Sequence, residues 1–205
     1  MPAPSALHHE GTTSPIVGHV NLMVDTFIAN ANAEDLRAII RGTLGASPPS
    51  VASALTAAAR RRMLQTNATA MPFPDRLFIK DESGSSRPGP ALRETLSRVC
   101  ALYGAGLGFA SLSVLSVVVR ATMGLEWEEG GELENVLASI DTDISQAIQS
   151  SREELESGRV RDLETARNAV NRLRSAVRDC REVVNKGIGG YPFEQGATAL
   201  DFWKI

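Results

Sequence analysis

A stretch of 21 residues without a single charge, Val99 to Val119, lies between Arg98 and Arg120 in a chain of 205 residues. A helix that crosses a lipid bilayer needs about 20 consecutive apolar residues. A helix that is buried on all sides within a helical bundle has a similar composition. In either case this stretch must be shielded from water. The fold must therefore either bury it among other helices or place it in a membrane.

Both interpretations of residues 99–119 have support in the sequence. Gly104 and Gly108 have the spacing that lets two membrane helices approach closely, so they are candidate helix-packing residues. Basic residues precede the stretch and acidic residues follow it, which would place the N-terminal side of a span in the cytoplasm. The stretch also holds many Ser and Ala residues suited to bundle packing, and aromatic residues do not flank both ends. We therefore expect a buried central helix over about residues 91–123, with a membrane span at 99–119 as the alternative.

The first 15 residues contain no Lys or Arg and no apolar run, which argues against a cleaved secretory signal. This Pro/Ser/Thr-rich segment is expected to be a disordered tail. His8, His9 and Glu10 lie in it, and a solvated tail is favoured there over a metal site.

Three helices are expected in residues 16–65, which would form a small N-terminal helical unit. Asn32 is the expected N-cap of the second helix, because its side chain can accept hydrogen bonds from the free N–H groups of the first turn. The third helix ends near Arg60, Arg61 and Arg62, a triplet for which a solvated helix end is favoured over a small nuclear-localisation or phosphate-binding patch. Apolar residues at helical spacing are expected to be buried: Val17, Val20, Val24, Phe27, Ile28, Leu36, Ile39, Ile40, Leu44, Val51 and Leu55.

Residues 66–90 interrupt the helical pattern with prolines, serines and glycines, which predicts a connector. Within it, the short apolar run from Leu77 to Ile79 is expected to form either a brief strand or a segment pinned to the bundle. A strand without a partner makes no sheet, so both alternatives stay open.

Residues 91–186 are expected to form a helical bundle that ends in an antiparallel hairpin, with helices near 132–157 and 159–185. Gly158 follows the first of these helices as its stop signal. The first helix is acidic and the second is basic, which favours pairing between them. The second helix has apolar residues at alternating steps of three and four, as in a coiled-coil seam: Leu163, Ala166, Val170, Leu173, Val177, Cys180 and Val184.

The last segment, residues 187–205, concentrates large apolar side chains after several glycines. Exposed aromatic side chains are unfavourable in water, and Trp and Tyr often anchor protein interfaces. The segment is therefore expected either to fold back onto the bundle or to dock on another protein. Its candidate interface residues are Tyr191, Phe193, Leu200, Phe202, Trp203 and Ile205.

Recognisable catalytic, cofactor-binding and metal-binding motifs are missing from the sequence. His19 is the last histidine, so a catalytic triad would have to recruit the N-terminal segment. The glycines between 104 and 108 do not complete a dinucleotide-binding loop, and the acidic residues at 141 and 143 do not complete a calcium loop. Cys100 and Cys180 are expected to be core residues of a protein in a reducing compartment. We expect no enzymatic activity, no cofactor and no bound metal.

The sequence thus predicts an all-α protein: a multi-helix bundle with a long apolar central helix and a C-terminal, coiled-coil-like antiparallel hairpin. The functional hypothesis is a non-catalytic intracellular protein, cytoplasmic or nuclear, that acts as an adaptor, scaffold or assembly factor. Its hairpin and aromatic tail would bind protein partners. The net charge of −3 argues against a nucleic-acid partner.

Three further alternatives remain at this point. The apolar seam can be satisfied within one chain or between two, so a homo-oligomer is possible. A single-span membrane protein would place the span at about 99–119 and the hairpin outside the bilayer. An enzyme or small-ligand binder that works in the bundle core is the third alternative, because helical bundles can hold apolar ligands.

Overall fold

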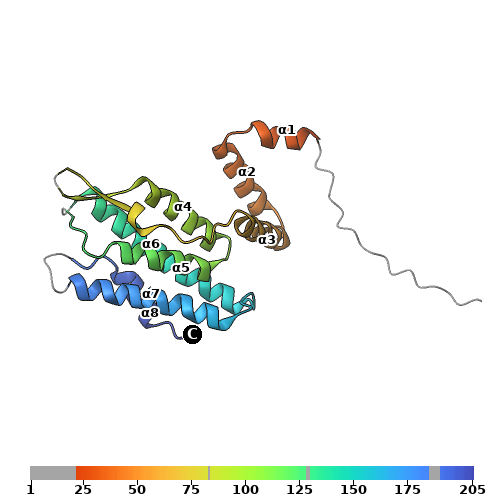
Figure 1. The fold of residues 1–205 in the computed structure, drawn as a ribbon. Coiled ribbons are helices and arrows are strands. Elements are labelled where there is room, and N and C mark those ends of the chain that lie inside the picture. Colours follow the sequence, from red (N-terminus) through yellow and green to blue (C-terminus); the bar gives the residue numbers. More distant parts are fainter. Residues whose placement is uncertain (1–21, 83, 128–129, 185–189) are drawn as a thin grey trace, which may run out of the picture. The chain divides into compact units, whose positions relative to one another are not determined.

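The computed structural model describes residues 22–82, 84–127, 130–184 and 190–205, and most of them are helical (Figure 1). The predicted all-α class and multi-helix bundle are confirmed. The chain divides into two compact units, Met1–Val51 and Ala52–Ile205. The first ends just inside α3, which spans Pro49–Gln65.

The first unit contains α1 (Leu22–Asn30) and α2 (Ala33–Ala46). Asn32 caps α2 as predicted: its Oδ1 accepts a hydrogen bond from the Asp35 backbone N–H at 2.8 Å. Residues 16–21 of the expected first helix lie outside the described residues. The expected burial is not observed, because no described side chain between residues 23 and 51 is buried.

The described part of the connector in the second unit lies against the bundle. After the 3₁₀ turn η1 (Pro74–Arg76), β1 (Phe78–Lys80) pairs antiparallel with β2 (Ser86–Pro88). The strand alternative therefore holds for this run, and its partner strand is one that the sequence analysis did not identify. Leu77, just before β1, is fully buried, and β2 packs against the long helix α6 (Glu132–Glu156).

The prediction of one continuous helix over 91–123 is wrong, because the chain forms α4 (Pro90–Gly104) and α5 (Gly108–Ala121). Gly106 has φ +72°, a left-handed conformation that glycine adopts without a steric penalty. The Leu107 N–H then bonds to the Leu102 carbonyl at 2.9 Å, and the Gly106 N–H bonds to the Tyr103 carbonyl at 2.9 Å. This hydrogen-bond pattern is a Schellman motif, which ends α4 and turns the chain into α5.

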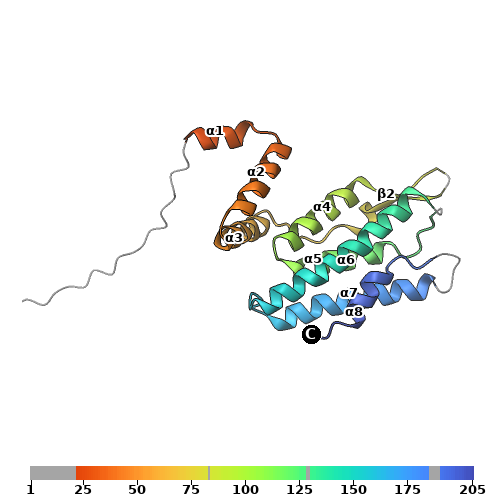
Figure 2. The same ribbon diagram turned by 180° about the vertical axis from the view of Figure 1, so that it is seen from behind.

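Helix α5 forms the centre of the second unit. It packs against α4, α6 and α7 (Leu163–Val184), and both views place it among these helices (Figures 1 and 2). Most of its side chains are buried, among them Leu112, Leu115 and Val118. The part of the uncharged stretch that forms α5 is therefore buried in the bundle, as the bundle-core interpretation predicted. Among the residues that the structure describes, no helix has the length and apolarity needed to cross a membrane.

Helices α6 and α7 run antiparallel and are joined by a short turn (Figures 1 and 2). The predicted seam is buried from Ala166 to Cys180, whereas Leu163 at its start is exposed. Both helices pack mainly against α5 and against α8 (Glu194–Asp201) rather than against each other. A coiled-coil pairing of α6 with α7 is therefore not supported. Among the described residues, no ion pair joins these two helices; the ion pairs of α7 lead to Arg120 in α5 and to Glu194 in α8.

Candidate functional site

The C-terminal segment, predicted either to fold back or to dock on a partner, packs onto the bundle in the structure. Phe193 and Leu200 are fully buried, and Trp203 is only 6% exposed. Tyr191 and Ile205 are half-buried against the core. Of the six candidate interface residues, Phe202 alone is largely exposed, at 82%. The other five contribute to the fold of the chain itself.

Helix α8 is anchored to α6 by Asp141, a carboxylate that the sequence analysis considered only as part of an incomplete calcium loop. Asp141 of α6 accepts hydrogen bonds from the backbone N–H groups of Gln195 and Gly196, at 3.0 and 2.7 Å. Burial raises the pKa of the Asp141 carboxyl, against the opposing effect of these two N–H groups. Arg174 of α7 also donates to the Trp203 carbonyl oxygen at 2.9 Å. These contacts fix the position of α8 against α6 and α7.

The two candidate helix-packing glycines do not share a packing face, because they belong to different helices. Gly104 ends α4, and apart from the neighbouring backbone of its own helix no heavy atom lies within 4 Å of the place where a Cβ atom would stand. Gly108 begins α5 and is buried, and a Cβ atom there would lie 2.4 Å from the backbone N of Ser151. Only Gly108 therefore serves close helix packing, and its neighbour is α6 of the same chain.

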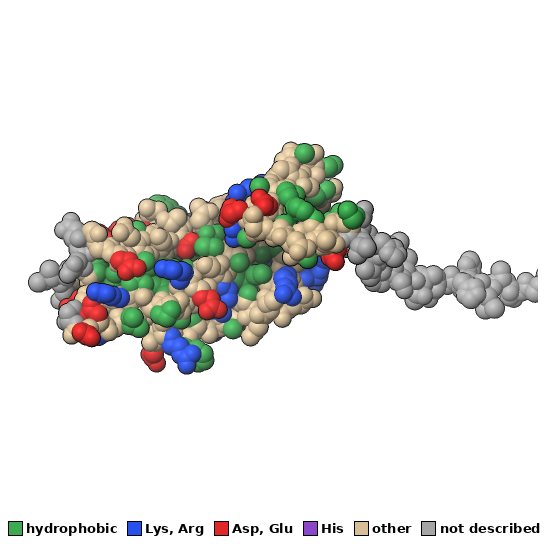
Figure 3. Space-filling view, turned by 90° about the horizontal axis from the view of Figure 1, so that it is seen from above, with side chains coloured by type: hydrophobic (Ala, Val, Ile, Leu, Met, Phe, Trp, Pro, Cys, Tyr) green, Lys and Arg blue, Asp and Glu red, His purple; other side chains and the backbone are tan. Residues whose placement is uncertain are grey.

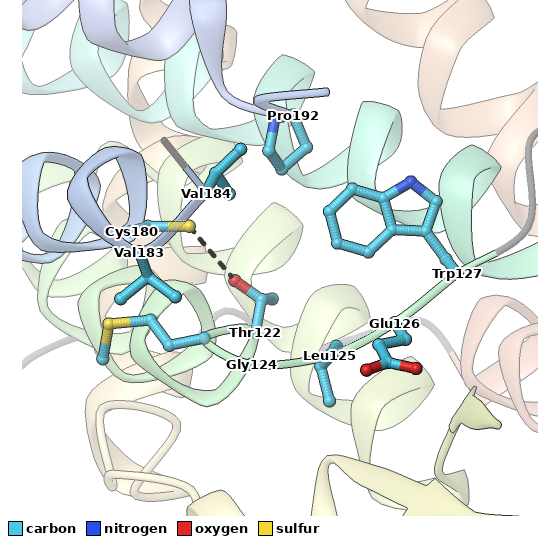
Figure 4. Close-up of a pocket in the computed structure, with 10 residues that line it drawn as sticks. Thr122, Gly124, Leu125, Glu126, Trp127, Cys180, Val183, Val184 and Pro192 are labelled. Carbon is cyan, nitrogen blue, oxygen red and sulfur yellow. Dashed lines mark hydrogen bonds between the residues drawn. The ribbon is translucent and has the colours of Figure 1, made fainter. Parts of the chain in front are cut away.

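An apolar pocket with a volume of about 560 Å³ lies beyond the C-terminal ends of α5 and α7. The segment after α5 contributes Leu125 and Trp127 to the lining, and α7 contributes Cys180 and Val184. Pro192 lines the side of the pocket that faces Leu125 (Figure 4). Pockets that bind small molecules have volumes of about 300–1,000 Å³ and mostly apolar walls. By its size and lining, this pocket can accommodate an apolar group.

The chemistry of this pocket is limited by its thiol. Cys180 Sγ lies 3.8 Å from the Thr122 hydroxyl, at the wall drawn in Figure 4. Burial raises the pKa of the Cys180 thiol above its ordinary value, so the thiol stays protonated at neutral pH. A protonated thiol is a poor nucleophile. The pocket is therefore suited to binding rather than to nucleophilic chemistry.

A second group of titratable side chains joins α4 to α6. Asp143 Oδ1 accepts a hydrogen bond from the Tyr103 hydroxyl at 3.1 Å and from the Cys100 thiol at 3.4 Å. Burial is the main cause that raises the pKa of each of the three groups. A thiol held protonated beside a carboxylate lacks the activation that a nucleophilic cysteine requires. We therefore interpret this cluster as a contact between helices.

The raised pKa of Asp143 makes the stability of the fold depend on pH. The folded state holds the Asp143 proton more firmly than the unfolded state, so this group stabilises the fold most at low pH. Its contribution is lost as the pH rises through the folded-state pKa. We expect Asp143→Asn, which keeps an oxygen acceptor for Tyr103, to raise the melting temperature relative to the wild type at pH 7.5. This advantage is expected to disappear near pH 4.

Melting temperatures of both proteins between pH 4 and 8 test this expectation. Asp162→Asn is a control of opposite sign, because hydrogen bonds from Thr165 and Glu164 lower the pKa of Asp162. That variant should lose stability at pH 7.5 and approach the wild type at low pH. A difference between Asp143→Asn and the wild type that stays constant over this range would contradict the prediction.

No cluster of three or more potential metal ligands occurs among the residues that the structure describes. His8, His9, Glu10 and His19, which the sequence analysis considered, lie outside those residues.

Both helices of the first unit carry exposed apolar side chains. Met23 of α1 is 77% exposed, and Phe27 and Ile28 are about half exposed at 46% and 50%. Ile39 and Ile40 of α2 are exposed to a similar extent. Figure 3 shows hydrophobic side chains at the surface of the helices that follow the grey N-terminal segment.

Comparisons with known proteins add no assignment to these features. No protein-family model matches the sequence, no curated protein matches it, and no solved structure matches the fold.

Proposed function

We propose that this protein is a non-catalytic interaction protein that binds a partner protein through the apolar faces of α1 and α2. The observation that carries the proposal is that both helices expose large apolar side chains while no described side chain in residues 23–51 is buried. Helices of 9 and 14 residues are marginally stable by themselves in water. A partner surface that covers their apolar faces would supply the missing stabilisation.

The apolar residues of both helices follow the spacing of a helix that binds in a groove. In α1, Val24, Phe27 and Ile28 are separated by three and one residues, so they lie on one face. In α2, the corresponding face carries Leu36, Ile39, Ile40 and Leu44. Helical peptides that dock into apolar grooves of other proteins use anchors at these intervals. The proposed partner therefore offers an apolar groove or helix face.

The opposite side of α2 is polar, which supports binding through one face rather than burial all round. Glu34 and Arg37 form an ion pair on this side, and both side chains are more than half exposed. Ala38 and Arg41 are also exposed. A helix with this division of polar and apolar faces covers only its apolar side when it binds.

The remaining candidate sites are consistent with a non-catalytic protein. Asp141 holds α8, Asp143 joins α4 to α6, and Cys180 lines an apolar pocket with its thiol protonated. We assign each of these groups a role in holding the second unit together. The exposed Phe202 is the one residue of the C-terminal segment that keeps its proposed role as a partner contact.

A pair of matched variants in α2 tests the proposal. Ile40→Asp places a charge on the apolar face, and Ala38→Asp places the same charge on the polar face of the same helix, about 160° away. We expect Ile40→Asp to weaken partner binding by about tenfold or more, because a charge buried in an apolar interface is costly. Ala38→Asp should bind like the wild type.

Binding is measured in two ways with the full chain. Affinity capture with isotope-labelled quantification compares the proteins retained by the wild type and both variants, and sedimentation velocity detects self-association of the purified chain. A partner retained equally by Ile40→Asp and Ala38→Asp would refute a role for the apolar face. A monomer that retains no protein specifically would refute the proposed function as a whole.

A further inference from the structure

An open groove of about 810 Å³ in the second unit gathers arginines from two segments that are far apart in the sequence. Arg60 and Arg61 come from α3, and Arg159 and Arg161 come from the turn between α6 and α7. Two carboxylates, Glu154 and Asp162, also line the groove, which leaves its lining with a net charge of +2. Like charges repel when they are gathered in this way, so the groove is favourable for an anion.

One of the four arginines has a structural role. The guanidinium of Arg60 donates to the carbonyl oxygen of Gly106 and, at 3.2 Å, to Glu154. The second oxygen of Glu154 accepts from the backbone N–H of Phe109 at 3.4 Å, near the start of α5. Both side chains are mostly buried, with 20% and 9% exposed. Arg60 and Glu154 thus compensate each other and tie α3 to the ends of α5 and α6.

The other carboxylate of the groove is also engaged. Asp162 accepts hydrogen bonds from the backbone N–H groups of Glu164 and Thr165, at 2.9 and 3.2 Å, and from the Thr165 hydroxyl at 2.6 Å. These are the bonds of an N-cap, and they hold the carboxylate at the start of α7. Asp162 is therefore committed to the helix rather than to a neighbouring arginine.

The other three guanidinium groups that line the groove have no carboxylate partner within the described part of the chain: those of Arg61, Arg159 and Arg161. Arg159 lies close to Arg60, because Nη2 of Arg159 and Nη1 of Arg60 are each 3.4 Å from the place of a Cβ atom on Gly106. Two positive groups therefore stand beside one another, and only one is neutralised by Glu154.

The groove also has an apolar floor beside its charged rim. Phe109 and Ala166 are buried beneath it, Val160 is half-buried and Leu64 is exposed. A ligand that joins a compact anionic group to an apolar or aromatic group would contact both parts. Guanidinium groups bind phosphate oxygens through paired hydrogen bonds, and a phosphate monoester carries a charge of about −1.5 to −2 at neutral pH.

We propose that this groove binds the phosphate group of an organic phosphate, with Arg61, Arg159 and Arg161 as the anion-binding residues. A phosphate monoester carries a negative charge close in size to the positive net charge of the groove lining, and it carries this charge in a single group. The carboxylates of an acidic peptide would be spread along a chain and would each carry a single charge. The proposal concerns residues 52–205 and does not depend on the interaction proposed for α1 and α2.

Isothermal titration calorimetry of the full chain with phenyl phosphate, at constant ionic strength, tests the proposal. Arg159→Gln combined with Arg161→Gln removes two of the three groups and is expected to weaken binding by about tenfold or more. The control combines Arg167→Gln with Arg172→Gln, which removes the same charge from exposed positions of α7 that do not line the groove. The control should bind phenyl phosphate like the wild type.

Three results would overturn the proposal. Absence of saturable binding at millimolar phenyl phosphate would exclude a phosphate site. Equal weakening in both double variants would show a diffuse effect of net charge rather than a site. Binding of a Glu/Leu peptide at the groove, lost in the Arg159/Arg161 variant while phenyl phosphate does not bind, would assign the groove to an acidic peptide.

Discussion

Replacing Gly108 by alanine is expected to lower the free energy of unfolding of the second unit by about 3 kcal/mol. The new methyl group would lie 2.4 Å from the backbone N of Ser151, 2.5 Å from its Oγ and 2.6 Å from its Cα. Backbone atoms cannot rotate away as the end of a flexible side chain can. The start of α5 would have to move away from α6, and its packing would be lost over several residues.

Gly104→Ala is the matched control for this substitution. Both glycines are replaced by the same residue, and both replacements reduce the entropy of the unfolded chain, which favours folding by about 0.4–1 kcal/mol. Apart from the neighbouring backbone of α4 itself, no heavy atom lies within 4 Å of the added methyl group at Gly104, so this variant should be as stable as the wild type or slightly more stable. The difference between the two variants therefore isolates the contact of Gly108 with Ser151.

Urea denaturation followed by tryptophan fluorescence measures this difference, because Trp127 and Trp203 both lie in the second unit. A loss of about 3 kcal/mol corresponds to a decrease in melting temperature of about 6–12 °C for a chain of this size. Equal stability of the two variants would mean that α5 does not approach α6 at Ser151. Destabilisation by Gly104→Ala alone would instead place the packing face on α4.

The broken central helix shows where pattern analysis of the sequence fails. The absence of charge over residues 99–119 correctly predicts burial of most of α5, but burial does not specify whether a helix is continuous. The signal for the break is local: Gly106 can adopt positive φ, and Leu102 and Leu107 flank it as the apolar pair that accompanies a Schellman motif. Three alternating glycines therefore indicated a turn rather than a helix-pairing motif.

The seam of α7 illustrates a second limit. Its spacing identifies the side chains that are buried, from Ala166 to Cys180, because apolar periodicity depends only on the helix itself. The partner of that face is decided by the tertiary arrangement, and here it is mainly α5. The charge difference between the two helices was consistent with direct pairing, yet exposed ion pairs contribute too little energy to determine which helices pack together.

The contacts that build the candidate sites depend on residues that are distant in the sequence. Asp141 caps α8 from 54 residues away, and Arg60 reaches Glu154 across 94 residues. No periodicity within either segment indicates such a contact. The triplet at Arg60 was predicted to be a solvated helix end, whereas its first arginine is mostly buried and only the following two are exposed. The sequence shows that three arginines are adjacent. Only the fold shows which of them forms an ion pair with a carboxylate.

Replacing Phe193 by alanine is expected to destabilise the second unit by about 3–5 kcal/mol, the range for truncating a buried aromatic side chain. Phe193 is fully buried where the chain enters α8, and its ring meets Tyr191 edge-to-face with centroids 6.0 Å apart. Removing the ring leaves a cavity beneath α8 and takes away this aromatic contact. If α8 left the bundle, Leu200 and Trp203 would also be exposed to water, because both are buried only while this segment packs on the bundle.

Phe202→Ala provides the control, because it removes the same atoms from a side chain that is 82% exposed. The unfolded chains of both variants lose the same group, so the difference in their free energies of unfolding reports burial alone. We expect Phe202→Ala to change stability by less than about 0.5 kcal/mol. Urea denaturation of both variants, with Trp203 fluorescence read in a Trp127→Phe background, provides the measurement. Similar stability of the two variants would mean that the C-terminal segment does not fold back in solution, and all six of its apolar residues would then become available to a partner.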